Sequence, residues 1–108
     1  MGKFVITKPT TTYRFNLNAN NGETILTSES YTTKAGCFNG IESVKTNSTH
    51  ERYDKKISKD SKYYFNLISA NGRIIGTSEM YDSVAGRDNG IESVKRTAPT
   101  AKIDDHTI

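Results

Sequence analysis

The chain contains nearly the same segment twice, and the second copy follows the first by fifty residues. Residues 13–45 and 63–95 align without a gap and are identical at 20 of 33 positions. Repeats of this kind are single supersecondary units that cannot cover their apolar face alone, so neighbouring copies share a core. We therefore expect two similar units that pack against each other.

Length, charge and cysteine content narrow the possible domain organisation, partners and cellular compartment of the protein. Two independent domains within 108 residues would each bury too little apolar surface, so we expect one domain, 1–108, with repeats at about 1–50 and 51–108. The net charge of +3 is small and does not demand a polyanionic partner. Cys37 has no partner for an intrachain disulfide, and the sequence shows no leader and no membrane-length apolar run. We expect a cytoplasmic protein without a membrane partner.

Each repeat begins with the pattern of a β-hairpin. In the first repeat Tyr13, Phe15 and Leu17 alternate with polar residues, which is the period of a half-buried strand. Asn21-Gly22 and Asn71-Gly72 then supply residues that accept positive φ, and another β-rich run comes directly after each pair. Both pairs are therefore predicted to be hairpin turns.

Two loop lengths fit the first hairpin. A two-residue loop puts Thr24 on the face of Phe15, whereas a three-residue loop with Gly22 in the left-handed conformation puts Ile25 there. The second repeat also has isoleucine at the position of Ile25, whereas both neighbours differ, and a buried face tolerates such changes least. We favour the three-residue loop, with both neighbours of Ile25 on the other face.

After residues 31 and 81 the pattern becomes helical. Thr32 and Asp82 are the predicted N-caps. The apolar stripe consists of Cys37, Ile41 and Val44 in the first repeat, and of Val84, Ile91 and Val94 in the second. Gly40 and Gly90 lie inside these helices, where each glycine destabilises the helix by about 1 kcal/mol relative to alanine. Their presence therefore indicates a close approach of helix to sheet.

The segments between these units read as further strands. Residues 3–7 and 53–57 are short β-rich runs at the fifty-residue offset, so the middle run ends one repeat and begins the next. The segment from Ala101 to Ile103 could add a last strand, and we expect residues 104–108 to be frayed.

Four motifs recur in the same order in both repeats. They are Phe-x-Leu, Asn-Gly, Ser-Glu-x-Tyr and Asn-Gly-Ile-Glu-Ser-Val-Lys, which run from Phe15 to Lys45 and from Phe65 to Lys95. This pattern resembles the YegP family of small bacterial proteins over nearly the whole chain. The resemblance implies an α+β fold in which two tandem β-β-β-α-β repeats form one antiparallel sheet, with both helices on one face and the last strands exchanged between repeats. It implies no activity.

The residues that could carry catalysis or bind a metal lack the necessary surroundings. The internal symmetry could bring Glu29 and Glu79, or Glu42 and Glu92, together as an acid/base pair of carboxylates. Nothing in the sequence makes one member of a pair the acid and the other the base, so we favour the interpretation that these glutamates are solvent-exposed surface residues. The histidines, His50 and His106, have no ligand partner at a metal-binding spacing. Cys37 is better explained as a small buried residue than as a thiol activated by Lys34. We expect that the protein is not an enzyme and that it binds no cofactor or metal.

One surface differs between the repeats. On the strand face assigned to solvent, polar residues of the first repeat are replaced in the second by apolar ones, namely Tyr64, Ile68, Ile74 and Met80. We interpret these four residues as a candidate interaction surface for a protein partner, for self-association or for an apolar small molecule. The alternative is that the tail or an exchanged strand covers them.

A basic cluster suggests a second type of ligand. Positive residues gather around the middle of the chain near aromatic ones, at Arg52, Lys55, Lys56, Lys59 and Lys62 with Tyr13, Tyr63 and Tyr64. Such a combination suits single-stranded nucleic acid, although Glu51, Asp54 and Asp60 lie among these cations. Taken together, the sequence predicts a monomeric, non-enzymatic binding or protein-interaction module, with a single-stranded nucleic-acid-binding module as the alternative.

Overall fold

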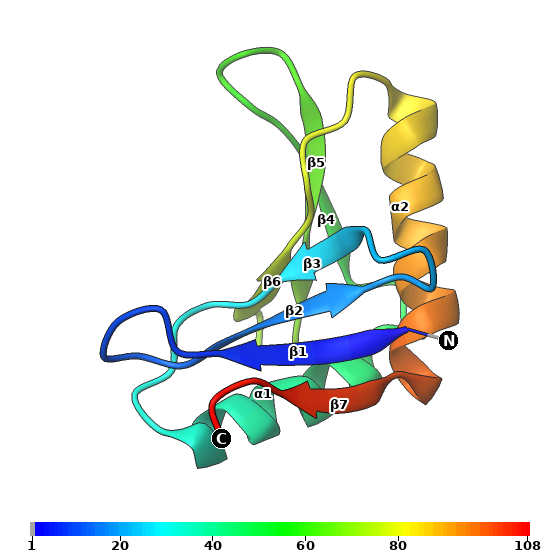
Figure 1. Ribbon diagram of the computed structural model, residues 1–108. Helices are drawn as coiled ribbons and strands as arrows, with labels where there is room; N and C mark the ends of the chain where they lie inside the picture. Colours follow the sequence, from blue (N-terminus) through cyan, green and yellow to red (C-terminus); the bar gives the residue numbers. More distant parts are fainter. Residues whose placement is uncertain (1) are drawn as a thin grey trace.

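The computed structural model describes residues 2–108 and has an α+β architecture (Figure 1). The elements in chain order are β1 (Lys3–Thr7), β2 (Arg14–Asn18), β3 (Thr24–Thr27), α1 (Lys34–Asn47), β4 (Tyr53–Ile57), β5 (Tyr63–Ile68), β6 (Ile74–Thr77), α2 (Val84–Thr97), the 3-10 turn η1 (Ala98–Thr100) and β7 (Lys102–Asp105). Each repeat thus contributes a run of three strands and then a helix.

Within the described residues all strands belong to one sheet, in the order β4-β5-β6-β3-β2-β1-β7. The two repeats meet at its centre, where β3 and β6 pair antiparallel through Thr27 and Thr77. The sheet is mixed and not wholly antiparallel as predicted, because β7 returns from α2 in the direction of β1 and pairs with it parallel. The strand after each helix pairs with the other repeat: β4 with β5, and β7 with β1.

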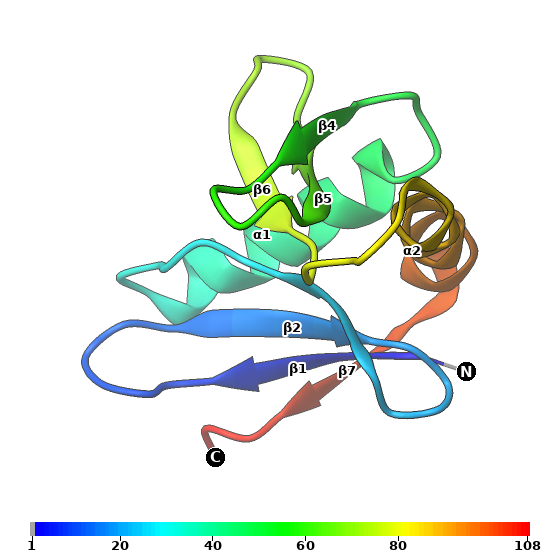
Figure 2. The ribbon, with the colours of Figure 1, turned by 90° about the horizontal axis from the view of Figure 1, so that it is seen from above.

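The buried apolar residues of both repeats form a single cluster. Alternate residues of the strands, such as Phe4, Phe15 and Phe65, contribute one side of this cluster. The predicted apolar residues of the two helices contribute the other side, namely Cys37, Ile41 and Val44 of α1 with Ile91 and Val94 of α2. Of the six residues predicted for the two apolar stripes, only Val84, in the first turn of α2, is exposed. The strong twist of the sheet turns β4, β5 and β6 relative to β1, β2 and β7 (Figure 2). As a result α1 contacts β5 and β6 of the second repeat, and α2 contacts β3 of the first.

The hairpin loop between β2 and β3 has the predicted length, but a bulge shifts the register of β3. The backbone N–H of Ala19 donates to the Glu23 carbonyl at 2.8 Å, and Gly22 has a φ of +88°. This is the three-residue loop with a left-handed glycine. The bulge leaves Ile25 between the pairs that β3 makes with β2, so that Ile25 and Leu26 are both buried. The prediction for Ile25 is confirmed, and the placement of Leu26 on the outer face was wrong.

The helices begin one residue later than the sequence suggested. Thr33 and Ser83 have extended backbone, and their hydroxyl groups accept hydrogen bonds from the N–H groups of Gly36 and Gly86, both at 3.0 Å. They are therefore the N-caps, and the prediction of Thr32 and Asp82 was wrong. The carboxylate of Asp82 instead forms an ion pair with Lys62.

The tail is more ordered than expected. Strand β7 extends to Asp105, and the N–H of His106 donates to the Ile6 carbonyl at 2.9 Å. The Asp105 carboxylate lies 3.0 Å from the Lys34 amine of α1 and accepts hydrogen bonds from the hydroxyl and backbone N–H of Thr107. The prediction that residues 104–108 are frayed was therefore wrong for the part that contacts β1 and α1.

Candidate functional site

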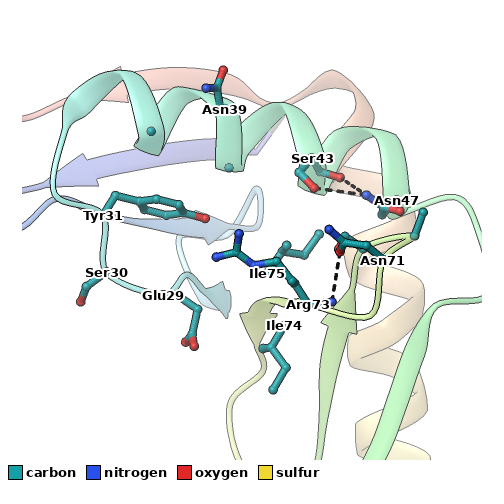
Figure 3. A pocket seen from close by; sticks show the side chains of 14 residues that line it. Glu29, Ser30, Tyr31, Asn39, Ser43, Asn47, Asn71, Arg73, Ile74 and Ile75 are labelled. Atoms are coloured by element: carbon teal, nitrogen blue, oxygen red, sulfur yellow. Dashed lines mark hydrogen bonds between the residues drawn. The ribbon is translucent and has the colours of Figure 1, made fainter.

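A cavity of about 470 Å³ opens where the two repeats meet, between α1 and β6 (Figure 3). We call it the junction cavity. Three segments line it: the stretch after β3 with Glu29, Ser30 and Tyr31, one side of α1 with Gly36, Asn39, Gly40, Ser43 and Asn47, and the β5–β6 hairpin with Ser69, Ala70, Asn71, Arg73, Ile74 and Ile75. Its size is within the range of small-molecule sites.

Tyr31 forms part of the cavity floor. Its ring lies parallel to that of Phe15, with centroids 6.2 Å apart, and passes so close to Gly40 that a Cβ there would be 2.6 Å from the ring Cζ. The glycine inside α1 therefore makes room for a tyrosine ring as well as for the sheet. Tyr81 and Gly90 repeat the arrangement in the second repeat.

The Tyr31 hydroxyl points into the cavity and has no hydrogen-bond partner among the described residues (Figure 3). Burial raises the pKa of this phenol, as does the neighbouring Cys37, whereas Arg73 acts to lower the pKa. The phenol is therefore protonated near neutral pH and can donate a hydrogen bond to a ligand.

Arg73 brings a positive charge to the same cavity. Its backbone N–H donates to the Asn71 side-chain oxygen at 3.3 Å, but its guanidinium makes no hydrogen bond or ion pair within residues 2–108. Figure 3 shows the guanidinium between the Tyr31 ring and Ile75. Glu29 lines the cavity as well and also has no ion-pair partner in the described chain.

The far wall of the cavity is held by side-chain hydrogen bonds. The Asn47 amide nitrogen donates to the Ser43 carbonyl at 2.8 Å and to the Ser43 hydroxyl at 3.2 Å. The Asn47 side-chain oxygen accepts a hydrogen bond from Arg52. These contacts order the last turn of α1 and join it to the segment before β4.

The internal symmetry places a second cavity, of about 400 Å³, at the equivalent position, and its lining also comes from both repeats. It is lined by Glu23, Thr24, Ile25, Glu79 and Tyr81. Tyrosine, isoleucine and one glutamate occupy matching positions in both cavities, but Glu23 replaces Arg73 and Thr24 replaces Ile74. The second cavity is therefore more acidic and less apolar than the junction cavity.

The four residues of the candidate interaction surface lie on the outer face of the second repeat. Ile68 and Ile74 are direct cross-strand partners, and Ile74 and Met80 are 44% and 52% exposed. Tyr64 is half-buried, and a hydrogen bond of 2.8 Å between Thr77 and Asn66 crosses the middle of the surface. The tail does not cover this surface, because β7 lies beyond β1 on the other half of the sheet. Ile74 belongs both to this surface and to the junction cavity.

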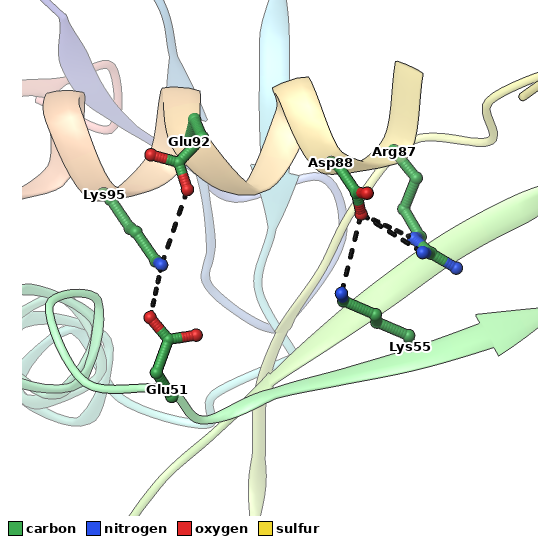
Figure 4. A network of polar contacts seen from close by, with 6 residues as sticks. All are labelled: Glu51, Lys55, Arg87, Asp88, Glu92 and Lys95. Atoms are coloured by element: carbon green, nitrogen blue, oxygen red, sulfur yellow. Dashed lines mark hydrogen bonds and ion pairs between the residues drawn. The ribbon is translucent and has the colours of Figure 1, made fainter. Parts of the chain in front are cut away.

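Most cations of the basic cluster are engaged within the protein. Lys55 lies 3.7 Å from Asp88 of α2, Lys56 lies 3.3 Å from Asp54, and Lys62 pairs with Asp82. Figure 4 shows how Lys55 with Asp88 and Arg87, and Glu51 with Lys95 and Glu92, connect the β4 segment to α2. Within the described chain only Lys59 of the five predicted cations makes no such contact.

The remaining sequence candidates lie apart from one another. Glu29 and Glu79 line different cavities, while Glu42 and Glu92 are on exposed helix surfaces. His50 is exposed in a loop, and His106 contacts Asp104 at 3.0 Å. Cys37 is fully buried, and burial raises the pKa of its thiol, as predicted for a core residue. Neither helix of the described residues is long and apolar enough to span a membrane.

Sequence reasoning missed the junction cavity because its walls come from both repeats. Arg73 was the available signal, since it is a charge reversal of Glu23 within an otherwise similar hairpin. The outer-surface comparison found Ile74 but did not connect it with α1 or with Tyr31.

Comparison with known proteins identifies the family. Residues 11–54 and 58–105 each match a family described as "Domain of unknown function (DUF1508)". The chain belongs to this family. It carries the domain twice in tandem, and it resembles the UPF0339 and YegP proteins in sequence and structure. The molecular function of this family is unknown.

Two curated relatives illustrate the similarity. A UPF0339 protein of Shewanella oneidensis is 59% identical over 51 residues, which are 46% of each chain, and the YegP protein of Escherichia coli K12 is 55% identical over 51 residues with the same coverage. The matched stretch thus spans about half the length of these relatives.

Two solution NMR structures match nearly the whole fold. The UPF0339 protein of Shewanella oneidensis has a TM-score of 0.90 at 54% identity, covering 96% of this chain and 90% of that one. The Escherichia coli YegP structure, described as a protein of unknown function, has a TM-score of 0.91 at 46% identity, covering 97% and 92%. The resemblance to YegP-type proteins is confirmed.

Proposed function

We propose that this UPF0339 protein is a non-enzymatic binding module that acts in the cytoplasm and holds a small ligand in the junction cavity. The supporting observation is that the Tyr31 hydroxyl and the Arg73 guanidinium line one cavity and have no partner in the described chain. Arg73 is exposed and Tyr31 is half-buried, so both donors are open to a ligand that enters the cavity and accepts hydrogen bonds.

Binding is a better explanation of this cavity than catalysis. A general base must be able to take a proton near the working pH, and burial keeps the Tyr31 phenol protonated. The thiol of Cys37 is buried in the core, where burial also raises its pKa. Glu29 lines the same cavity, but its carboxylate makes no hydrogen bond or ion pair with a serine, tyrosine or arginine of the described lining. The cavity offers recognition groups without a pair that could exchange a proton with a substrate.

The outer surface extends the same binding region. Ile74 lines the cavity and pairs across the strands with Ile68, so the apolar part of a ligand can leave the cavity over these two residues. Tyr64 and Met80 lie at the other end of the surface, beyond the hydrogen bond between Asn66 and Thr77. We therefore assign the primary contact to Ile68 and Ile74, and a lesser one to Tyr64 and Met80.

The test is an NMR titration of the isotope-labelled full chain with a panel of small amphipathic acids, amines and neutral compounds. We expect amide shifts at Gly40, Asn71 and Arg73, and weaker binding in Ile74→Thr, which installs the residue found in the second cavity. Met80→Ser, which restores the first-repeat residue outside the junction cavity, is the comparison variant and should weaken binding much less than Ile74→Thr, because Met80 makes only the lesser contact.

Two other results would contradict the proposal. The first is an absence of cavity shifts with every class of compound. The second is a set of concentration-dependent shifts at Tyr64, Ile68, Ile74 and Met80 without any ligand, which would identify the outer face as a self-association surface.

Single-stranded nucleic acid is the alternative ligand. Its support is weaker, because ion pairs occupy Lys55, Lys56 and Lys62. A mobility shift with single-stranded DNA or RNA that weakens steeply with salt would favour this alternative, and no shift at low salt would exclude it.

A further inference from the structure

The two cavities provide an internal comparison. They have the same tyrosine, the same buried isoleucine and the same glutamate position, so their shared features cannot explain a difference in ligand. At the matched positions the junction cavity has Arg73 where the other has Glu23, and Ile74 where the other has Thr24. One cavity has thus gained a positive charge and an apolar side chain at adjacent positions.

The tyrosine at the floor of each cavity experiences this difference. At Tyr31 burial, Cys37 and Glu29 raise the phenol pKa, whereas the positive charge of Arg73 acts to lower it. At Tyr81 the charges of Glu79 and Glu23 both add to the effect of burial and raise the phenol pKa. Glu29 and Glu79 thus act alike on their tyrosines, and the difference is that Arg73 favours negative charge beside Tyr31 whereas Glu23 disfavours it beside Tyr81.

We propose that the junction cavity recognises the carboxylate of a small amphipathic acid, with Arg73 and Tyr31 as donors and Ile74 as the apolar contact. This inference rests on the proposed binding function and specifies its ligand. A guanidinium presents paired N–H donors that match a carboxylate, and the protonated phenol adds another donor. The adjoining Ile74 and Ile68 then receive the apolar part of the acid.

Glu29 explains why a carboxylate is favoured over a phosphate. It lines the same cavity without an ion-pair partner in the described chain, so it repels an anionic ligand. This repulsion is stronger for a phosphate, which carries up to two charges at neutral pH, than for a carboxylate with one.

The experiment uses NMR titration of the full chain with three probes: hexanoate, hexanamide and inorganic phosphate. We expect hexanoate to shift the amides of Gly40, Asn71 and Arg73, and to bind more tightly than hexanamide or phosphate. Arg73→Glu should weaken hexanoate binding by about tenfold or more, since it removes a charge-assisted contact. Arg73 is exposed, and glutamate already occupies the equivalent position, so this variant should keep the wild-type spectrum elsewhere.

The reciprocal variant is Glu23→Arg. It should create hexanoate-dependent shifts at Gly90 and Tyr81, around the second cavity, while the junction cavity binds as before. If hexanamide matches hexanoate and Arg73→Glu has no effect, the carboxylate inference is wrong and the binding function stands. If phosphate binds more tightly than hexanoate, the carboxylate is the wrong anion. If neither six-carbon probe shifts the cavity amides, the inference fails, and the broader panel decides the binding function separately.

Discussion

The side chain of Leu26 occupies the space over Gly76, where a Cβ would lie 2.6 Å from the Leu26 Cδ2. The two residues hold equivalent positions in the two repeats and meet where β3 joins β6. The space at this seam therefore accommodates one leucine side chain and not two. The difference between the repeats at this position is a packing solution near the internal symmetry axis.

Adding a side chain at the seam should destabilise the fold. We expect Gly76→Ala to lower the free energy of unfolding by about 1–3 kcal/mol, because the methyl group overpacks against Leu26. Leu26→Ala should also destabilise, by about 2–5 kcal/mol, because Leu26 is fully buried. Urea unfolding measures both.

Combining the changes separates steric conflict from other effects. The double variant Leu26→Gly with Gly76→Leu again has a single leucine at the seam, now on β6 in place of β3. This double variant should therefore be more stable than Gly76→Leu alone, which has two leucines there. Equal stability of these two variants would show that the seam is not where the clash arises.

The N-caps of the helices give a second prediction. Thr33→Ala should lower the free energy of unfolding by about 1 kcal/mol, because it removes the hydroxyl that accepts from the Gly36 N–H. Thr32→Ala is the matched control and should change stability little, since the Thr32 side chain is exposed and makes no described hydrogen bond. If urea unfolding shows a larger loss of stability for Thr32→Ala than for Thr33→Ala, Thr32 is the N-cap after all.

Asp105 gives a prediction for acid pH. The hydroxyl and backbone N–H of Thr107, and to a lesser extent the Lys34 amine, lower the pKa of this carboxyl from 3.8 to about 2. Because the pKa is lower in the folded state, the stabilisation is complete above the ordinary value and is lost as the pH falls from there toward the folded value. Asp105→Asn should therefore be less stable than the wild type at about pH 6, and the difference should shrink toward about pH 3.

Asp60→Asn is the control for this measurement. Asp60 is exposed in a loop and makes no ion pair within the described residues, so its replacement should not change stability at either pH. A difference for Asp105→Asn that stays constant with pH would show that the contacts to Thr107 matter without the charge.

Gly40 tests the contact between α1 and Tyr31. Alanine usually stabilises a helix by about 1 kcal/mol over glycine, but here its methyl group would lie 2.6 Å from the Tyr31 Cζ and 3.1 Å from the Phe15 Cε2. We expect net destabilisation in thermal or urea unfolding. Gly36→Ala is the control with a smaller penalty, because its nearest neighbours are at 3.2 Å and 3.5 Å. A Gly40→Ala variant more stable than the wild type would contradict the close packing.

Much of the fold was predictable from local patterns. The hairpin loops are set by Asn21-Gly22 and Asn71-Gly72, where the glycine conformations are left-handed, and the helical stripes by their period. The place of Leu26 was not predictable, because a bulge in β3 breaks the alternation on which the assignment depended. The junction cavity was missed for a related reason: α1 and β6 come from different repeats, and no local pattern says that they meet.

The shared core leads to a fifth prediction, since we propose that residues 1–108 form one domain. A fragment of residues 1–50 should lack a cooperative unfolding transition as a monomer, because α1 packs on β5 and β6, which the fragment does not contain. Circular dichroism with analytical ultracentrifugation measures this. A monomeric fragment that melts cooperatively would mean that each repeat is an independent domain, whereas a folded dimer would agree with mutual coverage.

The parallel pairing of β7 with β1 has a consequence for synthesis in the cell. Strand β1 is translated before the other described strands, but the strand that covers its outer edge is translated almost a hundred residues after it. Until then that edge is an open template onto which a neighbouring nascent chain can add a strand. Translation that stops short of Lys102 would leave this edge of β1 without its partner strand permanently.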